Sequence, residues 1–512
     1  MTEWNVKPRN PLLVAYGLSL FGGVIIFLGW AGFGIWPLEF VALVPLWAAL
    51  ELVRERSWKT ALGVSWLYGT VGIAGGYHWM VEFFEVFSGF GLFASLGLFL
   101  LFSTYLGAQY ATMGVLYWAI RGRGWSVATA ALSTFIVTEW LFPKLFPVYL
   151  ANTLLQQPLL VQIADLGGPL LVSVLIGVVN TAAFEAFRWW RGARQMPVAT
   201  FAAAVAFAAF TLIYGAVRIG QVDAEVEAAP PLELGIVQVN MGIFEARKWA
   251  GEGHRRLLEQ SLELEKEGDL DLLVWPESAY RPKLARTLPI VAKEVRQELK
   301  TPILFGGSSV THEEGQRKLY NTVFLMDEEG VIRETYDKTY LLMFGEYLPF
   351  GETFPVLYEF SPNSSHFTPG SHVEALSFGP WRISTPVCYE DVLPGFTREM
   401  IEHANPHILI NLTNDAWFGD TQEPWIHLVL AQFRAIEHRR YMVRSTNSGI
   451  SAVIDPVGRI VAKTGIQTRE NIRATVHMME GHTIYARLGD WPGWLSLLAT
   501  AVTLIRRRRP TR

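Results

Sequence analysis

The chain has 512 residues, of which 51% are hydrophobic and 18% charged, and its formal net charge at pH 7 is −4. This charge says little about partners, because it averages an apolar N-terminal region and a region of ordinary globular composition. The single cysteine, Cys388, excludes an intramolecular disulfide and a metal site built from several thiolates.

The first 220 residues consist of long apolar runs separated by short basic loops. Runs of about 20 apolar residues have the length of a helix that crosses a hydrocarbon core of ~30 Å. The pattern therefore predicts a multi-span α-helical membrane domain at residues 1–220 with seven transmembrane helices. Their expected positions are 12–30, 37–52, 61–77, 91–120, 127–142, 169–187 and 198–217.

Basic residues gather before the first span and after the second, fourth and sixth, and loops of this kind are cytoplasmic. The last region, 488–512, is expected to add a C-terminal transmembrane helix and a basic tail. Both termini should then lie in the cytoplasm, with the globular region on the other side. The arginines at 506–509 fit a topology anchor better than a nucleic-acid site, so no nucleic-acid partner is expected. The basic residues that indicate this orientation are Lys7, Arg9, Arg54, Arg56, Lys59, Arg121, Arg123, Arg188, Arg191 and Arg194.

A soft linker rich in Ala, Glu and Pro is expected at 221–231, followed by a globular domain at 232–487. Short β-type runs alternate there with helix-length polar segments, which predicts a layered α/β domain with its sheet buried between helices. The expected strands are 234–239, 272–275, 303–305, 322–326, 381–387, 407–412, 441–445 and 450–454. The expected helices include 253–266, 288–299 and 424–440.

Three strand ends in this domain carry side chains suited to acyl chemistry, Glu277, Lys338 and Cys388. Such ends converge at one edge of a layered sheet, and a thiol that attacks an acyl carbon needs a base and a cation. Taken singly, each residue also has an ordinary interpretation: a small buried thiol, a capping glutamate, and a lysine in a surface ion pair. The sequence around them decides between the two interpretations.

Five short motifs surround these residues: Trp-Pro-Glu-Ser at 275–278, Tyr-Asp-Lys at 336–338, Phe-Gly-Glu-Tyr at 344–347, Cys-Tyr-Glu at 388–390 and Asn-Asp-Ala-Trp-Phe-Gly at 414–419. Together they resemble the nitrilase superfamily in its membrane-embedded branch, the apolipoprotein N-acyltransferases. The resemblance extends over nearly the whole chain, including the layout of seven spans plus one.

The resemblance implies a nitrilase-like αββα sandwich that faces the periplasm from a bacterial inner membrane. It also implies a reaction in which an acyl chain moves from a phospholipid to a cysteine sulfur. From there the chain moves to the free α-amino group of a diacylated apolipoprotein. The partners implied are these two lipid substrates and the bilayer, with no cofactor. No metal is expected either, because the 11 histidines show no ligand spacing.

Carried over by position, the resemblance makes Cys388 the nucleophile, Glu277 the general base and Lys338 the stabiliser of the oxyanion and the thiolate. Glu346 matches a second glutamate that orients Lys338 or the incoming amine. The backbone N–H of Tyr389 follows the nucleophile and is a second candidate donor to the oxyanion. The supporting residues expected around this site are Glu390, Trp417 and Phe418.

The chain departs from the family pattern at Tyr340 and Met343, where a His and a Pro are usual, so the geometry of this lysine loop is less defined than the triad. Two alternatives stay open: a membrane-tethered hydrolase of the nitrilase type, and a transporter or assembly factor without catalysis. Seven spans favour lipid substrates, and the outer loops 78–85 and 142–147 are candidate lipid contacts. Charged or broken helices typical of transporters are scarce in these spans.

Overall fold

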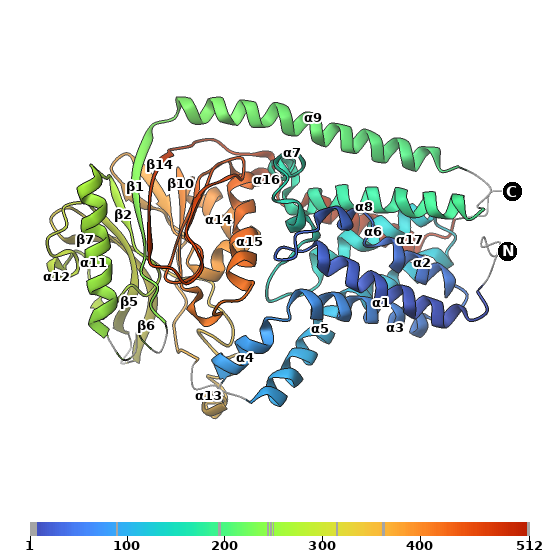
Figure 1. Cartoon of the computed structure of the whole chain (residues 1–512), viewed down its shortest axis with the longest axis horizontal. Helices are drawn as coiled ribbons and strands as arrows, with labels where there is room; N and C mark the ends of the chain where they lie inside the picture. Colours follow the sequence, from blue (N-terminus) through green and yellow to red (C-terminus); the bar gives the residue numbers. More distant parts are fainter. Residues whose placement is uncertain are drawn as a thin grey trace. The chain divides into compact units, whose positions relative to one another are not determined.

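The computed structural model of the chain describes residues 8–88, 91–192, 196–242, 245, 248, 250–313, 316–360 and 364–508 (Figure 1). The chain forms two compact units. One comprises Met1–Val81, Gly91–Arg218 and Leu488–Arg512, and the other comprises Glu82–Phe90 and Ile219–Arg487. Three of the basic residues behind the expected orientation, Lys7, Arg194 and Arg509, lie outside the described residues.

The described residues up to 228 and those of the C-terminal segment form helices and connecting loops, with no strand among them. Four helices, α1, α5, α8 and α9, are long and apolar enough to cross a membrane, while α6 and α17 are shorter apolar helices. The eightfold crossing therefore stays a prediction. The helices are α1 Pro11–Gly29, η1 Trp36–Phe40, α2 Val44–Leu52, α3 Trp58–Gly76, α4 Met80–Ser88, α5 Leu92–Gly122, α6 Val127–Leu141, η2 Leu150–Leu154, α7 Pro158–Val161, α8 Ala164–Trp190, α9 Val198–Ala228 and α17 Trp491–Ile505.

Two expectations for this region need correction. The expected span 37–52 is divided into η1 and the nine-residue α2. Pro37 and Pro45 each stand at the start of one of these helices, where a proline without an N–H is tolerated. The expected linker 221–231 is largely helical, because α9 continues to Ala228 (Figure 1). Its Ala and Glu residues are strong helix formers, and Asp223 is paired with Arg459 at 2.8 Å.

The second unit contains two β-sheets. The first has the strand order β14-β1-β2-β5-β6-β7-β4, with β3 paired to β5, and the second has the order β13-β12-β11-β10-β9-β8. The strands of the first sheet are β1 Pro231–Gln238, β2 Leu272–Val274, β3 Tyr280–Ala285, β4 Ile290–Val291, β5 Ile303–Glu313, β6 Gln316–Met326, β7 Val331–Asp337 and β14 Glu470–His477. Those of the second are β8 Leu376–Phe378, β9 Trp381–Ser384, β10 Ile408–Thr413, β11 Met442–Thr446, β12 Ala452–Ile454 and β13 Ile460–Lys463.

Helices cover the outer faces of both sheets. Leu257 of α11 packs on the first sheet, and Leu428 of α15 packs on the second. A third apolar cluster joins the two sheets, with Val274 on one side and Ile410 on the other. This is an αββα sandwich, so the expected fold class is confirmed (Figure 1). The helices of this unit are α11 Ala250–Glu267, α12 Lys293–Arg296, α13 Leu357–Phe360, η3 Cys388–Val392, α14 Pro394–Ala404, η4 Asp415–Trp417, α15 Glu423–His438 and α16 Ile484–Leu488.

The prediction of a helix at 288–299 is wrong. The segment forms β4 and the single turn α12 instead. Ile290 pairs with Ile332 of β7, and this pairing at the sheet edge prevails over the helical spacing of the local apolar residues.

Candidate active site

The three strand ends singled out in the sequence meet in the second unit. Glu277 follows β2, which runs parallel to β1 and β5, and Lys338 directly follows β7. Cys388 begins η3 after Val387, which bridges to Leu412 of β10. Cys388 has a φ of 49°, a left-handed conformation that costs free energy in a residue other than glycine. Such a turn is typical of a functional residue held by its surroundings.

The left-handed turn at Cys388 is held from β10. The side-chain amide of Asn411 donates to the carbonyl oxygens of Pro386, at 2.9 Å, and of Cys388, at 3.1 Å. Asn411 is fully buried, and Cys388 itself is partly exposed. The thiol is therefore presented by a fixed backbone while it stays accessible.

Lys338 is buried between two glutamates. Its Nζ lies 2.7 Å from Glu346 Oε2 and 3.8 Å from Glu277 Oε1. Asn321 on β6 joins the two carboxylates, because its amide donates to Glu277 Oε1 at 2.7 Å and to Glu346 Oε1 at 2.8 Å. The backbone oxygen of Asn321 also accepts from the N–H of Lys338 at 2.8 Å. Asn321 was not singled out in the sequence, where it is an ordinary polar residue within a strand.

Burial is the largest single influence on the pKa values of Glu277, Lys338 and Cys388. It raises the pKa of Glu277 above its ordinary value, although Lys338 acts in the opposite direction. Burial and the charge of Glu277 also raise the pKa of the Cys388 thiol. Burial would lower the pKa of Lys338, but Glu346, Cys388 and Glu277 outweigh it and raise that pKa. These shifts favour a neutral thiol beside a charged ammonium, and they make Glu277 a stronger proton acceptor than an ordinary carboxylate.

Glu390 joins the nucleophile turn to the lysine loop. Its carboxylate accepts from the N–H groups of Val387, Thr339 and Tyr340 at 2.7–2.8 Å, and from the hydroxyl of Tyr336 at 2.9 Å. Burial raises the pKa of Glu390 to about 7, against the opposing charge of Lys338. Glu390 therefore holds the backbone of these two segments in place from inside the domain.

The other expected supporting residues lie on the two turns of the site. Tyr389 follows the nucleophile, and burial raises the pKa of its hydroxyl to about 12. Trp417 and Phe418, at the end of η4, are half-buried. The ring of Phe418 stacks on Phe83 with centroids 5.2 Å apart. The structure thus places Phe83, in the loop 78–85 that is a candidate lipid contact, against the expected supporting residue Phe418.

A buried charged network lies behind the nucleophile turn and was missed in the sequence. His427 of α15 contacts Asp391 of η3 and Asp415 of η4, each at 3.0 Å. Within the described residues, Asp415, Glu423 and His427 are the one group whose donor atoms approach the spacing of a metal site. Both ring nitrogens of His427 already face carboxylates, and Arg444 adds positive charge, so we assign this group to an ion-pair network.

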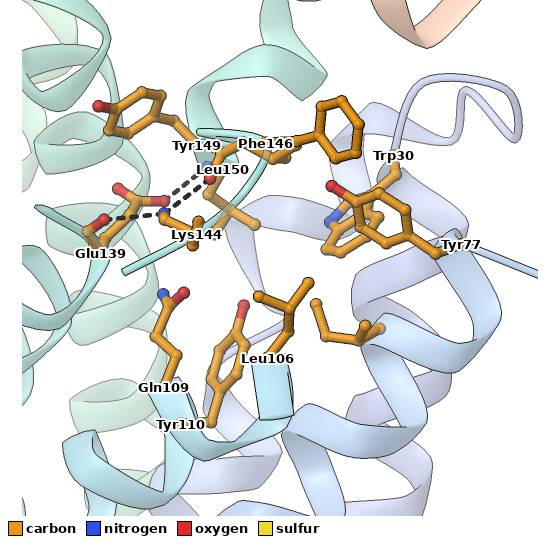
Figure 2. A pocket seen from close by; sticks show the side chains of 12 residues that line it. Trp30, Tyr77, Leu106, Gln109, Tyr110, Glu139, Lys144, Phe146, Tyr149 and Leu150 are labelled. Atoms are coloured by element: carbon orange, nitrogen blue, oxygen red, sulfur yellow. Dashed lines mark hydrogen bonds between the residues drawn. The ribbon is translucent and has the colours of Figure 1, made fainter. Parts of the chain in front are cut away.

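The first unit contains a separate pocket beside the loop that follows α6 (Figure 2). Lys144 reaches into its wall, where Nζ donates to the backbone oxygens of Glu139 and Val148 at 2.8 and 2.9 Å. The carboxylate of Glu139 accepts from the N–H of Leu150 at 2.6 Å. Aromatic, amide and charged groups share the lining, which includes Trp30, Tyr77, Gln109, Tyr110, Phe146 and Tyr149.

Comparison with known proteins identifies the family of the chain. Residues 22–182 match the family model described as apolipoprotein N-acyltransferase N-terminal domain, and residues 233–482 match the model described as carbon-nitrogen hydrolase. The apolipoprotein N-acyltransferase of Geobacter metallireducens is 28% identical over 515 residues, which cover 98% of this chain and 96% of that protein. The enzyme of the same name from Methylococcus capsulatus is 29% identical over 517 residues, which cover 96% of each chain. The chain belongs to the apolipoprotein N-acyltransferase family.

Membership of the apolipoprotein N-acyltransferase family confirms the resemblance inferred from the five motifs. The carbon-nitrogen hydrolase match includes Glu277, Lys338 and Cys388, and the N-terminal match includes the loop that carries Lys144. The departures from the family pattern at Tyr340 and Met343 lie on an exposed part of the lysine loop. The ring of Tyr340 packs on the ring of Phe396, with the two centroids 4.7 Å apart.

Proposed function

We propose that this protein is a membrane-bound acyltransferase of lipoprotein maturation. It moves an acyl chain from a phospholipid, through a thioester on Cys388, to the free α-amino group of the N-terminal diacylglyceryl-cysteine of apolipoproteins. The observation that carries the proposal is the sole cysteine on a strained turn beside a buried lysine and its glutamates. The names of the relatives supply the substrate class.

In the first half-reaction, Glu277 takes the thiol proton while the sulfur of Cys388 attacks the ester carbonyl of the phospholipid. The ammonium of Lys338 and the backbone N–H of Tyr389 stabilise the oxyanion of the tetrahedral intermediate. When this intermediate collapses, the carbon–oxygen bond breaks, and Glu277 returns the proton to the departing lysophospholipid alkoxide. The enzyme is left as a thioester.

In the second half-reaction, the α-amino nitrogen attacks the thioester carbonyl and gives a proton to Glu277. The carbon–sulfur bond breaks, and Lys338 stabilises the departing thiolate of Cys388 until the proton returns to it. An amide on the apolipoprotein and the free thiol result. Glu346 holds Lys338 in place throughout, at 2.7 Å from its Nζ.

The location follows from the sequence. We propose that the catalytic unit faces the periplasm from a bacterial inner membrane and that both termini lie in the cytoplasm. The four long apolar helices and the family of the relatives support a membrane-bound enzyme. Both substrates carry acyl chains that lie in a bilayer and reacting groups at its surface, which suits this arrangement.

Mass spectrometry of the intact, full-length protein tests the proposal. After incubation with phospholipid, we expect the wild-type protein to gain the mass of one acyl chain. Cys388→Ala should gain none and should not transfer, while keeping its fold, because truncation at a partly exposed turn removes little packing. Turnover in purified Cys388→Ala, or an adduct on another residue, would contradict the assignment.

A further inference from the structure

Two carboxylates hold the imidazole ring of His427 from opposite sides. Nδ1 lies 3.0 Å from Asp415 Oδ1, and Nε2 lies 3.0 Å from Asp391 Oδ1. Asp391 belongs to the same short helix as Cys388, and Asp415 begins η4, two residues after β10. All three side chains are buried. The ring therefore links the turn that presents the nucleophile to the turn that presents Trp417.

This geometry requires a proton on both ring nitrogens. A neutral imidazole carries one proton, so one of the two contacts would then set a nitrogen lone pair against a carboxylate lone pair. Asp391 also accepts a hydrogen bond from Arg444 through its other carboxyl oxygen, Oδ2. Burial and Arg444 oppose the charge on His427, but Asp391 and Asp415 outweigh them and raise the pKa of His427 to about 10.

The charges around the ring balance only when His427 is charged. Asp391 on η3 and Asp415 on η4 contribute two negative charges, and Arg444 on β11 contributes one positive charge. Burial raises the pKa of Glu423, which lies on the same helix as His427, well above its ordinary value and so favours the neutral form of this carboxyl. The imidazolium supplies the second positive charge.

Asp415 acts on the catalytic groups. Thr413, at the end of β10, donates to Asp415 Oδ1 at 3.4 Å and is also a hydrogen-bonding neighbour of the Cys388 sulfur. After the larger effects of burial, Glu277 and Lys338, the charge of Asp415 adds to the rise in the pKa of the thiol. An uncompensated carboxylate here would oppose formation of the thiolate.

We propose that His427 is a positioning residue: as an imidazolium it fastens the nucleophile turn to η4 and cancels the charge of Asp415 near Cys388. The inference rests on the proposed role of Cys388 as nucleophile. It adds a residue that touches neither substrate, but sets the backbone and the electrostatic environment of the sulfur.

Alkylation of the only cysteine measures this effect without lipid or acyl transfer. We expect iodoacetamide to modify Cys388 in full-length His427→Gln at pH 8 at least about fivefold more slowly than in wild type, with a steeper rise at higher pH. Asp415→Asn should react faster than wild type. The double variant His427→Gln/Asp415→Asn should return toward the wild-type rate, because both charges of the pair are then removed.

His438→Gln is the matched control, since His438 is equally buried on the same helix, and its alkylation profile should equal that of wild type. An unchanged profile in folded His427→Gln would overturn the proposal, as would a stoichiometric metal ion in the purified protein. If His427→Gln does not fold, Asp415→Asn decides, and an unchanged or slower rate there overturns the proposal. Failure of the proposed function would appear separately, as wild type that alkylates normally but forms no acyl adduct.

Discussion

Lys338 owes its position to groups that hold it from three sides. Glu346 and Glu277 face its ammonium, and the backbone oxygen of Asn321 accepts from its N–H. A charged lysine in a buried site stabilises a developing oxyanion far more strongly than it would in water, because little solvent screens it. Burial also raises the pKa of the Cys388 thiol, so the proposed attack needs a proton acceptor, the role that we propose for Glu277.

We therefore expect both Glu277→Gln and Lys338→Met to acylate Cys388 about 10²–10⁴ times more slowly than wild type, with phospholipid in excess. The first variant removes the proton acceptor, and the second removes the positive charge at the oxyanion. The rate of acyl adduct formation, followed by mass spectrometry, measures both. Glu329→Gln and Lys283→Met are matched controls at exposed positions and should acylate at the wild-type rate. A normal rate in either site variant would remove that residue from contact with the reacting atoms.

Single residues also show the limit of inference from sequence. Glu277, Lys338 and Cys388 could be assigned to one candidate site from the sequence, because each stands in a distinctive motif, and Glu277 and Cys388 also follow expected strands. Asn321 and His427 could not, since one is a polar residue within a strand and the other is a histidine on an amphipathic helix. Their importance comes from contacts with residues far along the chain, Glu277 for Asn321 and Asp391 for His427, and burial against such a partner leaves no local signal.

At the scale of elements, the lysine loop is held by its backbone. Thr339 and Tyr340 donate their N–H groups to Glu390, whereas the side chains of Tyr340 and Met343 are about half exposed. The two departures from the family pattern thus affect side chains that are largely exposed, where a different residue disturbs little packing. The loop keeps its place because the carboxylate of Glu390 accepts hydrogen bonds both from the lysine loop and from Val387 of the nucleophile turn.

We expect Glu390→Gln to lower the rate of Cys388 acylation by about tenfold or more, because an amide cannot accept all four of these hydrogen bonds. Its melting temperature in detergent should fall as well. Tyr340→His, which restores the usual family residue, should stay within about threefold of wild type, since its backbone N–H is retained. Equal acylation rates in Glu390→Gln and wild type would show that the loop is held by other contacts.

Elements also differ in how far the sequence defines them. The buried strands β2, β10 and β11 were predicted within one residue at each end, because their apolar runs are short and bounded. The edge strands β13 and β14 were not predicted, since their exposed faces carry charged residues and pairing alone makes them strands. The segment after residue 220 was expected to be a linker, yet its alanines and glutamates extend α9.

At the scale of the whole molecule, the chain joins a helical unit and an αββα sandwich, and each matches its own family model. Thioester chemistry on a nitrilase-like sandwich permits water or an amine as the acceptor, so the sandwich alone does not separate a transferase from a hydrolase. The helical unit favours a transferase, because substrates with acyl chains must be met at a membrane. The lifetime of the acyl-enzyme in the absence of an amine acceptor distinguishes a transferase from a hydrolase.

In the proposed reaction one nucleophile serves two lipid substrates, so we expect a ping-pong course in which the lysophospholipid leaves before the apolipoprotein enters. The thioester should persist without acceptor, because Glu277 and Lys338 are buried and the acyl chain itself shields the partly exposed Cys388 from water. A diacylated lipopeptide with a free α-amino group should discharge it, and the same peptide with a blocked amine should not. The mass of the intact protein, followed after each addition, measures both outcomes. An adduct that decays in buffer as fast as it does with the free amine would identify a hydrolase, because water would then be the natural acceptor.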